Sequence, residues 1–421
     1  MNLAQKAVKS VFFHGISHNL NLIYGVISSI ILARLLIPED FGKVALAVSI
    51  MEMIARLRNI SIESAVIHKQ SDEKRVFSTQ FFLSLFLEIP FLIAVLGSRP
   101  FIIGRYTREI ANIVLILAVA SSLRSISLPF TTWMQKNLEY KKMALFFTLG
   151  PLISIAITLI LAFQGFSVWS LVAGRVLNYI FDTIVPIILV PWRPSWDFDI
   201  EIARDIWQYC SRALLLEIFS WVMWAGDDFI VGTWLGTNAL GYYTMAWNLS
   251  SLPTQKISQV VDGVAFPTYS KLQYDRLALS HAFINFASSV VRICAFISVW
   301  LVIIAPEFIS IMLGKKWLPA VATFQFMILY ALLRPVYENA GSIFFAKNKL
   351  QYIIYCRIFQ VFIIIFGGYY LSTRFGIEGM AWAIGLMMFV GVIIKYYFLQ
   401  REIDISIHEI FIPPFIGVAV T

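Results

Sequence analysis

Charged residues are scarce in this chain of 421 residues. Asp, Glu, Lys and Arg together make up only 14% of it, whereas 59% is hydrophobic and the mean hydropathy is +0.77. One soluble core cannot enclose so much apolar surface, so the scarcity of charge excludes a soluble or disordered protein and predicts an integral membrane protein. An aromatic share of 15%, led by 35 Phe, is typical of helices that face lipid.

Cysteine is rarer still. Cys210, Cys294 and Cys356 are far apart, and each lies in an apolar run without a CxxC or CxxH spacing. Metal and redox sites need closely spaced ligands. We therefore predict free thiols within the membrane, no metal site and no cofactor.

Catalytic and phosphate-binding signatures are also missing. The chain has no GxxxxGK[ST] motif, no cluster of metal ligands and no nucleophile elbow. A membrane polysaccharide polymerase or lipid-linked glycosyltransferase needs charged groups gathered on a large outer loop, but the longest outer connector, Gly97 to Glu109, holds one acid. The sequence therefore predicts a protein that is not an enzyme, with such a polymerase or transferase as the weaker alternative.

Clusters of positive charge are absent, although the formal net charge is +8. No stretch gathers four or more Lys or Arg, so we expect no nucleic acid partner. The connectors on one side of the membrane hold more than twice as many cations as those on the other, which predicts a cytoplasmic amino terminus. The amino-terminal run contains His14, His18 and Asn21 and is expected to be a retained first helix, not a signal peptide.

Long apolar runs are what the sequence has in abundance. A helix needs about 20 residues to cross the hydrocarbon layer, and twelve such runs predict an all-α integral membrane protein of about twelve transmembrane helices. The apolar tail from Ile410 to Thr421 is expected to begin a thirteenth helix. The predicted spans are 10–33, 41–62, 77–97, 110–131, 143–163, 167–190, 206–233, 239–264, 283–305, 319–343, 351–371 and 377–398.

Three motifs recur between the two halves of the chain. ILARLLIPEDFGKVALA matches VGTWLGTNALGYYTMA, MQKNLEY matches AKNKLQY, and GFSVWSLVAG matches GIEGMAWAIG. The spacings are similar: 199 residues from Gly42 to Gly241, 212 from Tyr140 to Tyr352, and 211 from Gly165 to Gly376.

In each match, the second copy of the motif lies six predicted spans after the first. The pattern predicts an amino-terminal six-helix lobe in residues 1–200, a second in 201–400, and the start of a truncated thirteenth helix in 401–421. Because six is even, the lobes would be related by a pseudo-two-fold axis along the membrane normal, an arrangement typical of transporters that work by alternating access.

At these motifs the chain resembles the Wzx-type polysaccharide flippases of the multidrug/oligosaccharidyl-lipid/polysaccharide exporter superfamily, above all the colanic-acid and exopolysaccharide exporter branch. The stretches that carry the resemblance are ARLLIPEDFGKVALA, LGTNALGYYTMAWNLSSLP, FPTYSKL, LGKKWLPA and FGIEGMAWA. The resemblance implies a protein of the bacterial inner (plasma) membrane that moves undecaprenyl-diphosphate-linked oligosaccharide from the cytoplasmic to the periplasmic leaflet. It implies contact with this lipid-linked oligosaccharide and with membrane lipids, and it makes a polysaccharide polymerase and other assembly proteins candidate partners. A multidrug exporter of the same superfamily is the main alternative, because its architecture would be unchanged.

Polar residues inside the predicted spans are the candidates for function, because each costs several kcal/mol unless it faces a cavity or a partner. In span 1, His14, His18 and Asn21 share a face that either lines a cavity or hydrogen-bonds to a neighbouring helix, and either histidine is a candidate for proton binding. In span 2, the residues Glu52, Arg56, Asn59 and Glu63 are expected on one side of the helix. In span 8, the shared polar face is formed by Asn248, Gln255 and Gln259.

Three cations, Arg56, Arg212 and Lys256, are predicted to bind the diphosphate. The resemblance implies that spans 1, 2, 7 and 8 border the central cavity, and guanidinium and ammonium groups match phosphate oxygens. The alternative is that each only pairs with a nearby acid such as Glu217 or Asp262. Weaker candidates on spans expected to be peripheral are Arg124, Arg175, Arg292 and Arg334.

Three carboxylates, Asp227, Asp228 and Asp262, are candidates for coupling transport to Na+ or H+. Carboxylates in a cavity titrate or coordinate hard cations. For Asp227 and Asp228, a position beside water at the membrane interface is the alternative.

Overall fold

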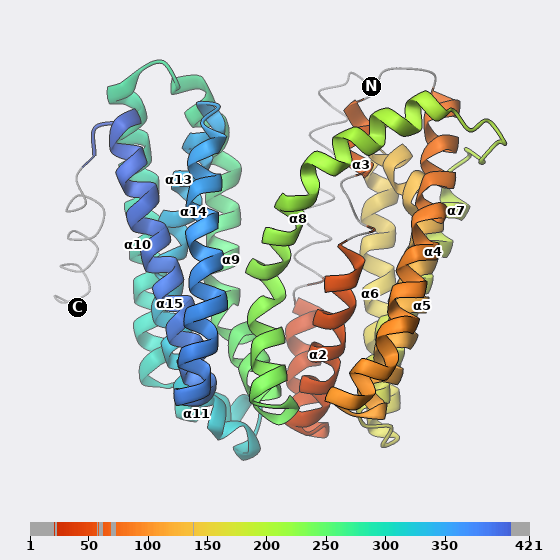
Figure 1. Cartoon of the computed structure of the whole chain (residues 1–421). Coiled ribbons are helices and arrows are strands. Elements are labelled where there is room, and N and C mark those ends of the chain that lie inside the picture. Colours follow the sequence, from red (N-terminus) through yellow and green to blue (C-terminus); the bar gives the residue numbers. More distant parts are fainter. Residues whose placement is uncertain are drawn as a thin grey trace. The chain divides into compact units, whose positions relative to one another are not determined.

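The computed structural model describes residues 21, 23–56, 58, 62–68, 73–137 and 139–405, and every regular element among them is a helix. The chain divides into two compact units, Met1–Trp221 and Val222–Thr421, whose helices are labelled in Figure 1. The division between the units lies within α8 (Ile200–Trp234), whereas the sequence predicted a lobe boundary at residue 200.

Unit 1 is a bundle with α5 in contact with most of its other helices. It packs against α2, α3, α4, α6 and α7. At one end, the buried side chains of Phe130 and Met134 from α5 pack against Met143 and Phe146 from α6. Along the chain, the helices are Ile23–Leu35, α2 (Pro38–Ala55), α3 (Ile62–His68), α4 (Glu73–Arg105), α5 (Arg108–Lys136), α6 (Tyr140–Phe163), α7 (Val168–Leu189) and the first part of α8.

The first repeated motif forms a fixed corner of unit 1. Pro38 is the first residue of α2, where a missing N–H costs nothing. The buried carboxylate of Asp40 accepts a hydrogen bond from the Ile37 N–H at 3.4 Å and another from the Ser167 hydroxyl at 2.8 Å. Asp40 therefore joins the start of α2 to the turn between α6 and α7.

The helices of unit 2 are interrupted at two places. α12 and α13 are separated just before Pro335, and the run from Leu350 to Glu402 contains non-helical backbone at Gly376, with φ 64° and ψ −145°. That 53-residue run would be about 80 Å long as one helix, more than twice the ~30 Å of a hydrocarbon core, so the break divides it. The elements after α8 are α9 (Thr237–Leu272), α10 (Arg276–Ile303), α11 (Ala305–Met312), the 3-10 helix η1 (Lys315–Ala320), α12 (Val321–Ala331), α13 (Arg334–Ala346), α14 (Leu350–Phe362), the π-helix η2 (Ile363–Gly368) and α15 (Tyr369–Glu402).

The surface is that of a membrane protein. Among the described residues, seven helical runs are long and apolar enough to cross a membrane. Large apolar side chains such as Phe86, Ile93 and Phe101 are more than half exposed, as expected where the solvent is lipid. α2, α8 and α9 are not among the seven runs, and these are the helices on which most of the polar candidate residues were predicted. The chain is thus an all-helical, multi-span membrane protein.

Span 2 is where the structure departs most from the sequence prediction. α2 ends at Ala55 with Arg56 as its cap, and α3 begins at Ile62. Glu52, Arg56 and Glu63 therefore do not share one helix face, and Asn59 lies outside the described residues, as does the tail from Ile410 to Thr421. As predicted, Cys210, Cys294 and Cys356 form no disulfide, and all three are buried.

Candidate functional site

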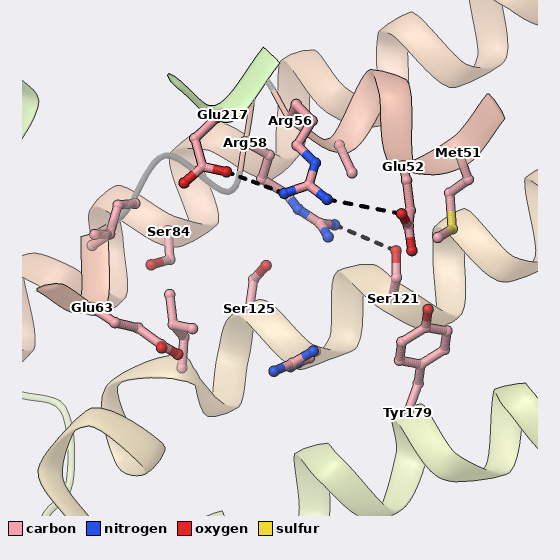
Figure 2. Close-up of a pocket in the computed structure, with 14 residues that line it drawn as sticks. Met51, Glu52, Arg56, Arg58, Glu63, Ser84, Ser121, Ser125, Tyr179 and Glu217 are labelled. Carbon is pink, nitrogen blue, oxygen red and sulfur yellow. Dashed lines mark hydrogen bonds and ion pairs between the residues drawn. The ribbon is translucent and has the colours of Figure 1, made fainter. Parts of the chain in front are cut away.

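A polar cavity of about 420 Å³ lies inside unit 1 (Figure 2). It is lined from α2, α3, α4, α5, α7 and α8 and from the segment between α2 and α3. Charged side chains in a membrane protein are costly unless they face a cavity or each other, so their concentration here makes this cavity a candidate functional site. Three arginines and three glutamates line it: Arg56, Arg58, Arg124, Glu52, Glu63 and Glu217.

Arg56, a predicted diphosphate ligand, lies in the wall of this cavity. Its Nη1 donates to Glu217 Oε2 at 3.1 Å, and its Nη2 is 3.9 Å from Glu52 Oε2 (Figure 2). The side chains of Arg56 and Glu217 remain 25% and 24% exposed. The two carboxylates hold the guanidinium in place and offset part of its charge.

Arg58 was not predicted from the sequence, and it forms the most buried ion pair of the cavity. Its Nη1 donates to Glu88 Oε2 at 3.1 Å and to the Ser121 hydroxyl at 3.4 Å, and its guanidinium lies 4.3 Å from the centroid of the Phe91 ring. The hydroxyl of Ser125 donates to the other oxygen of Glu88. These contacts fasten the segment after α2 to α4 and α5. On a continuous helix, Arg58 would point away from Arg56, because residues two positions apart do not share a face. Since α2 ends at Ala55, both arginines can line one cavity.

Arg124 was ranked low because span 4 was expected to be peripheral. α5 instead contacts most of the helices of unit 1, and the exposed side chain of Arg124 lines the cavity. Among the described residues, its guanidinium donates no hydrogen bond, although the carboxylates of Glu63 and Asp182 are close enough to interact with its charge. Arg124 is therefore the cavity arginine whose donors remain available to a ligand.

Several predicted site residues cannot be located. His14 and His18 lie outside the described residues. The backbones of α8 and α9 are described, but the side chains of five predicted residues on them lie outside the described part: Arg212, Gln255, Lys256, Gln259 and Asp262. Their roles stay predictions.

The other predicted polar residues of spans 1 and 8 do not line this cavity. The Asn21 side-chain amide donates to the Phe147 carbonyl oxygen on α6 at 2.6 Å, which is an interhelical hydrogen bond. Asn248 is exposed on α9.

Asp227 is a buried carboxylate on α8. Its Oδ2 accepts a hydrogen bond from the Tyr243 hydroxyl at 2.7 Å, and both side chains are less than a tenth exposed. This burial argues against a position beside water for Asp227, whereas Asp228 is only partly buried. Among the described residues, no three His, Cys, Asp or Glu side chains gather as a metal site would require.

A second cavity, of about 240 Å³, lies inside unit 2. Its charged lining residues are Arg334, Arg357, Lys395 and Glu338, and its aromatic ones are Trp224, Trp247, Tyr330, Tyr337 and Phe345. From the sequence, Arg334 was expected to be peripheral, and Arg357 and Lys395 were counted among the connector cations. Both instead line this cavity, Arg357 from α14 and Lys395 from α15.

Comparisons with known proteins agree with one another. A family model described as "Polysaccharide biosynthesis protein" matches residues 31–322. The chain is 23% identical over 353 residues to the teichuronic acid biosynthesis protein TuaB of Bacillus subtilis (strain 168), covering 83% of this chain and 73% of TuaB. It is 21% identical over 415 residues to the lipopolysaccharide biosynthesis protein WzxC of Escherichia coli (strain K12), covering 96% of this chain and 82% of WzxC.

Two solved structures share the fold. The lipid II flippase MurJ in an inward closed conformation has a TM-score of 0.78 at 15% identity, covering 97% of this chain and 92% of MurJ. An outward-facing multidrug resistance transporter of the MATE family has a TM-score of 0.62 at 16% identity, covering 93% and 95%. The family match over residues 31–322 shows that the chain belongs to the polysaccharide biosynthesis proteins, and the two solved structures show the fold that it shares with them.

Proposed function

We propose that this protein moves undecaprenyl-diphosphate-linked oligosaccharide from the cytoplasmic to the periplasmic leaflet of the bacterial inner membrane, for cell-surface polysaccharide biosynthesis. The observation that carries the proposal is the arginine-lined cavity of unit 1 in a chain of this family. A lipid diphosphate entering the membrane region needs charge-assisted hydrogen bonds to replace its water. The named roles of TuaB and WzxC in polysaccharide biosynthesis point to the same substrate class.

The diphosphate is proposed to bind Arg56, Arg212 and Lys256, with Arg124 added from the cavity geometry. Arg124 presents donors that no described residue uses, whereas Arg56 is held by Glu52 and Glu217. Guanidinium groups bind phosphate oxygens through two parallel N–H donors, which favours arginine over lysine at such a position.

Backbone landmarks support the proposal of a duplicated lobe of six helices, with twelve spans and alternating access. α2 begins at Pro38 and α9 at Thr237, which is the same spacing as that of Gly42 and Gly241. Gly165 and Gly376, which the sequence repeat pairs, both have a positive φ. The turns after α5 and α13 have matching hydrogen bonds, from Glu139 N–H to Met134 O and from Lys349 N–H to Phe344 O. Glu139 and Lys349 are 210 residues apart, whereas the pair predicted from the sequence, Tyr140 and Tyr352, is 212 apart.

The amino terminus is proposed to be cytoplasmic. Leaving Lys395 and Arg357, which line the cavity of unit 2, out of the count of inner cations keeps the cation bias in the same direction. Coupling to Na+ or H+ through Asp227, Asp228 or Asp262 is proposed as well. The buried bond between Asp227 and Tyr243 makes Asp227 the first of these to test.

A multidrug exporter remains the second candidate because of one observation. Glu52, Glu63 and Glu217 line the same cavity as the arginines, and carboxylates are what an exporter of organic cations would use. Export of lipid-linked oligosaccharide and efflux of a cationic dye, measured in the same cells, separate the two candidates.

The experiment that tests the arginine role compares Arg124→Gln with Arg175→Gln, a matched control at an exposed arginine of α7 that does not line the cavity. If Arg124 binds the diphosphate, its loss lowers oligosaccharide export at least about tenfold, the scale of one charge-assisted hydrogen bond, while protein abundance in the membrane is unchanged. An equal effect in both variants, or a fall in abundance that accounts for the loss, contradicts the role.

A further inference from the structure

The cavity of unit 2 has a surplus of positive charge among its lining residues. Three cations, Arg334, Arg357 and Lys395, face one acid, Glu338. The cavity of unit 1, by contrast, is lined by equal numbers of arginines and glutamates. Placing cations inside a membrane protein is costly, so this surplus indicates an anionic ligand for unit 2.

The chain path places two of these arginines where they can meet a ligand. The break before Pro335 puts Arg334 in the first turn of α13, where its Nε is 3.8 Å from Glu338 Oε1 and its guanidinium lies 5.9 Å from the Trp224 ring centroid. Arg357 projects from α14 and is half-buried. Among the described residues, Arg357 makes no hydrogen bond or ion pair. Its five N–H donors are available to a ligand.

Lys395 is held rigidly at the same cavity. It is 3% exposed, its Nζ donates to the Tyr337 carbonyl oxygen at 2.8 Å, and it lies 3.3 Å from the centroid of the Tyr337 ring. Gly341 leaves the space for this ammonium group, since a Cβ there would come within 3.1 Å of Nζ. The Tyr337 hydroxyl in turn donates to Gln360 Oε1 at 2.9 Å, so the ring that supports Lys395 is fixed.

The remaining walls are unusually aromatic for an anion site. Trp247 and Tyr330 stack with ring centroids 5.9 Å apart and an interplanar angle of 21°, and Trp224 adds a third large ring. Flat aromatic faces pack against the C–H face of a sugar ring, whereas a bare phosphate has no apolar face to offer. The volume of about 240 Å³ is below the roughly 300–1,000 Å³ of pockets for drug-sized ligands, so it suits one sugar ring and not a whole oligosaccharide.

We propose that this cavity is a subsite for one acidic sugar of the transported oligosaccharide. The sugar carboxylate would accept hydrogen bonds from Arg357 and Arg334, and the ring would pack against Trp224 and the stacked pair Trp247 and Tyr330. The inference rests on the proposed transport function and adds a substrate class to it: oligosaccharides that contain a carboxylated sugar.

The test uses the full chain purified in detergent and titrated with methyl β-D-glucuronide, methyl β-D-glucoside and inorganic diphosphate. Wild type is expected to bind the glucuronide at least about tenfold more tightly than the glucoside, the scale of a charge-assisted hydrogen bond. Arg357→Gln should remove this preference, and Arg357→Lys should retain part of it, since the charge survives without the planar fork. Arg292→Gln, at an exposed arginine of α10 outside the cavity, is the matched control and should bind as wild type does. Trp224→Leu should weaken binding of both glycosides.

Three results would overturn the proposed subsite. The first is that wild type binds the two glycosides equally or binds neither, and the second is that Arg292→Gln loses the preference for the glucuronide as Arg357→Gln does. The third is that wild type binds diphosphate more tightly than the glucuronide, with the same dependence on Arg357. The last result would reassign the cavity to the lipid diphosphate. Oligosaccharide export is also measured in cells that carry each variant, so that failure of the subsite can be distinguished from failure of the proposed transport function. If wild type exports oligosaccharide but shows no preference for the glucuronide, the subsite alone fails; if wild type exports none, the transport proposal fails whatever the glycosides do.

Discussion

Removing one partner of the ion pair between Arg58 and Glu88 should be among the most destabilising single changes in unit 1. Both side chains are less than a tenth exposed, their closest atoms are 3.1 Å apart, and Ser121 and Ser125 complete the hydrogen bonds around them. Arg58→Gln leaves the Glu88 carboxylate buried without its cation. Stranding a buried charge in this way costs about 3–5 kcal/mol, which lowers the ratio of folded to unfolded protein by roughly 150-fold or more.

The cost can be measured by unfolding the purified protein in mixed detergent micelles with increasing SDS and following tryptophan fluorescence. Because the stranded carboxylate causes the loss, the double variant with Arg58→Gln and Glu88→Gln should regain more than half of it. Arg99→Gln is the control, since Arg99 makes only an exposed contact with Asn112 on the neighbouring helix. A loss below about 1 kcal/mol in Arg58→Gln, or no recovery in the double variant, would refute the account of this cavity wall.

Three further expectations concern the backbone, the orientation and the coupling ion. Gly376→Ala should destabilise the protein by about 1–3 kcal/mol, because φ 64° with ψ −145° is a conformation that residues with a Cβ avoid. The control Gly97→Ala, in a helix with open space around it, should be neutral or stabilising. Equal shifts of the melting temperature in the two variants would contradict this expectation. A cysteine at Asn348 should be labelled by a membrane-impermeant reagent only from the cytoplasm and one at Thr237 only from outside, and the reverse pattern would invert the topology. Asp227→Asn should abolish the dependence of export on a Na+ or H+ gradient, and Tyr243→Phe should weaken this dependence. If export by Asp227→Asn keeps its full dependence on the gradient, Asp227 is not the coupling residue.

The all-helical fold and several of its helices could be predicted from the sequence, because a membrane span requires an uninterrupted apolar run of fixed length. The span predicted at 167–190 is α7, Val168–Leu189. The prediction of one continuous helix for span 2 was wrong, because the segment between Ala55 and Ile62 contains neither Gly nor Pro, the residues that usually mark the end of a helix. The polar residues of that segment were therefore interpreted as one face of a longer helix.

The candidate site was less accessible to sequence reasoning. Arg58 is 30 residues from Glu88 and 63 from Ser121, and no periodicity within one helix reveals partners that distant. Arg124 and Arg334 were undervalued for a related reason, since the position of a helix within its bundle is set by tertiary packing. The repeated motifs could have related these two arginines to each other. Arg124 and Arg334 are separated by the same number of residues as the turns that follow α5 and α13, and each arginine lines the cavity of its own unit.

The central claim is that this chain moves a lipid-linked oligosaccharide across the membrane, and the location of that lipid in cells depleted of the protein tests it most directly. Membrane vesicles of known orientation would be treated with an impermeant enzyme that cleaves exposed oligosaccharide. The account predicts that undecaprenyl-diphosphate-linked oligosaccharide accumulates on the cytoplasmic face after depletion and returns to the periplasmic face when the wild-type chain, but not Arg124→Gln, is restored. Oligosaccharide that reaches the periplasmic face without the protein would contradict the claim.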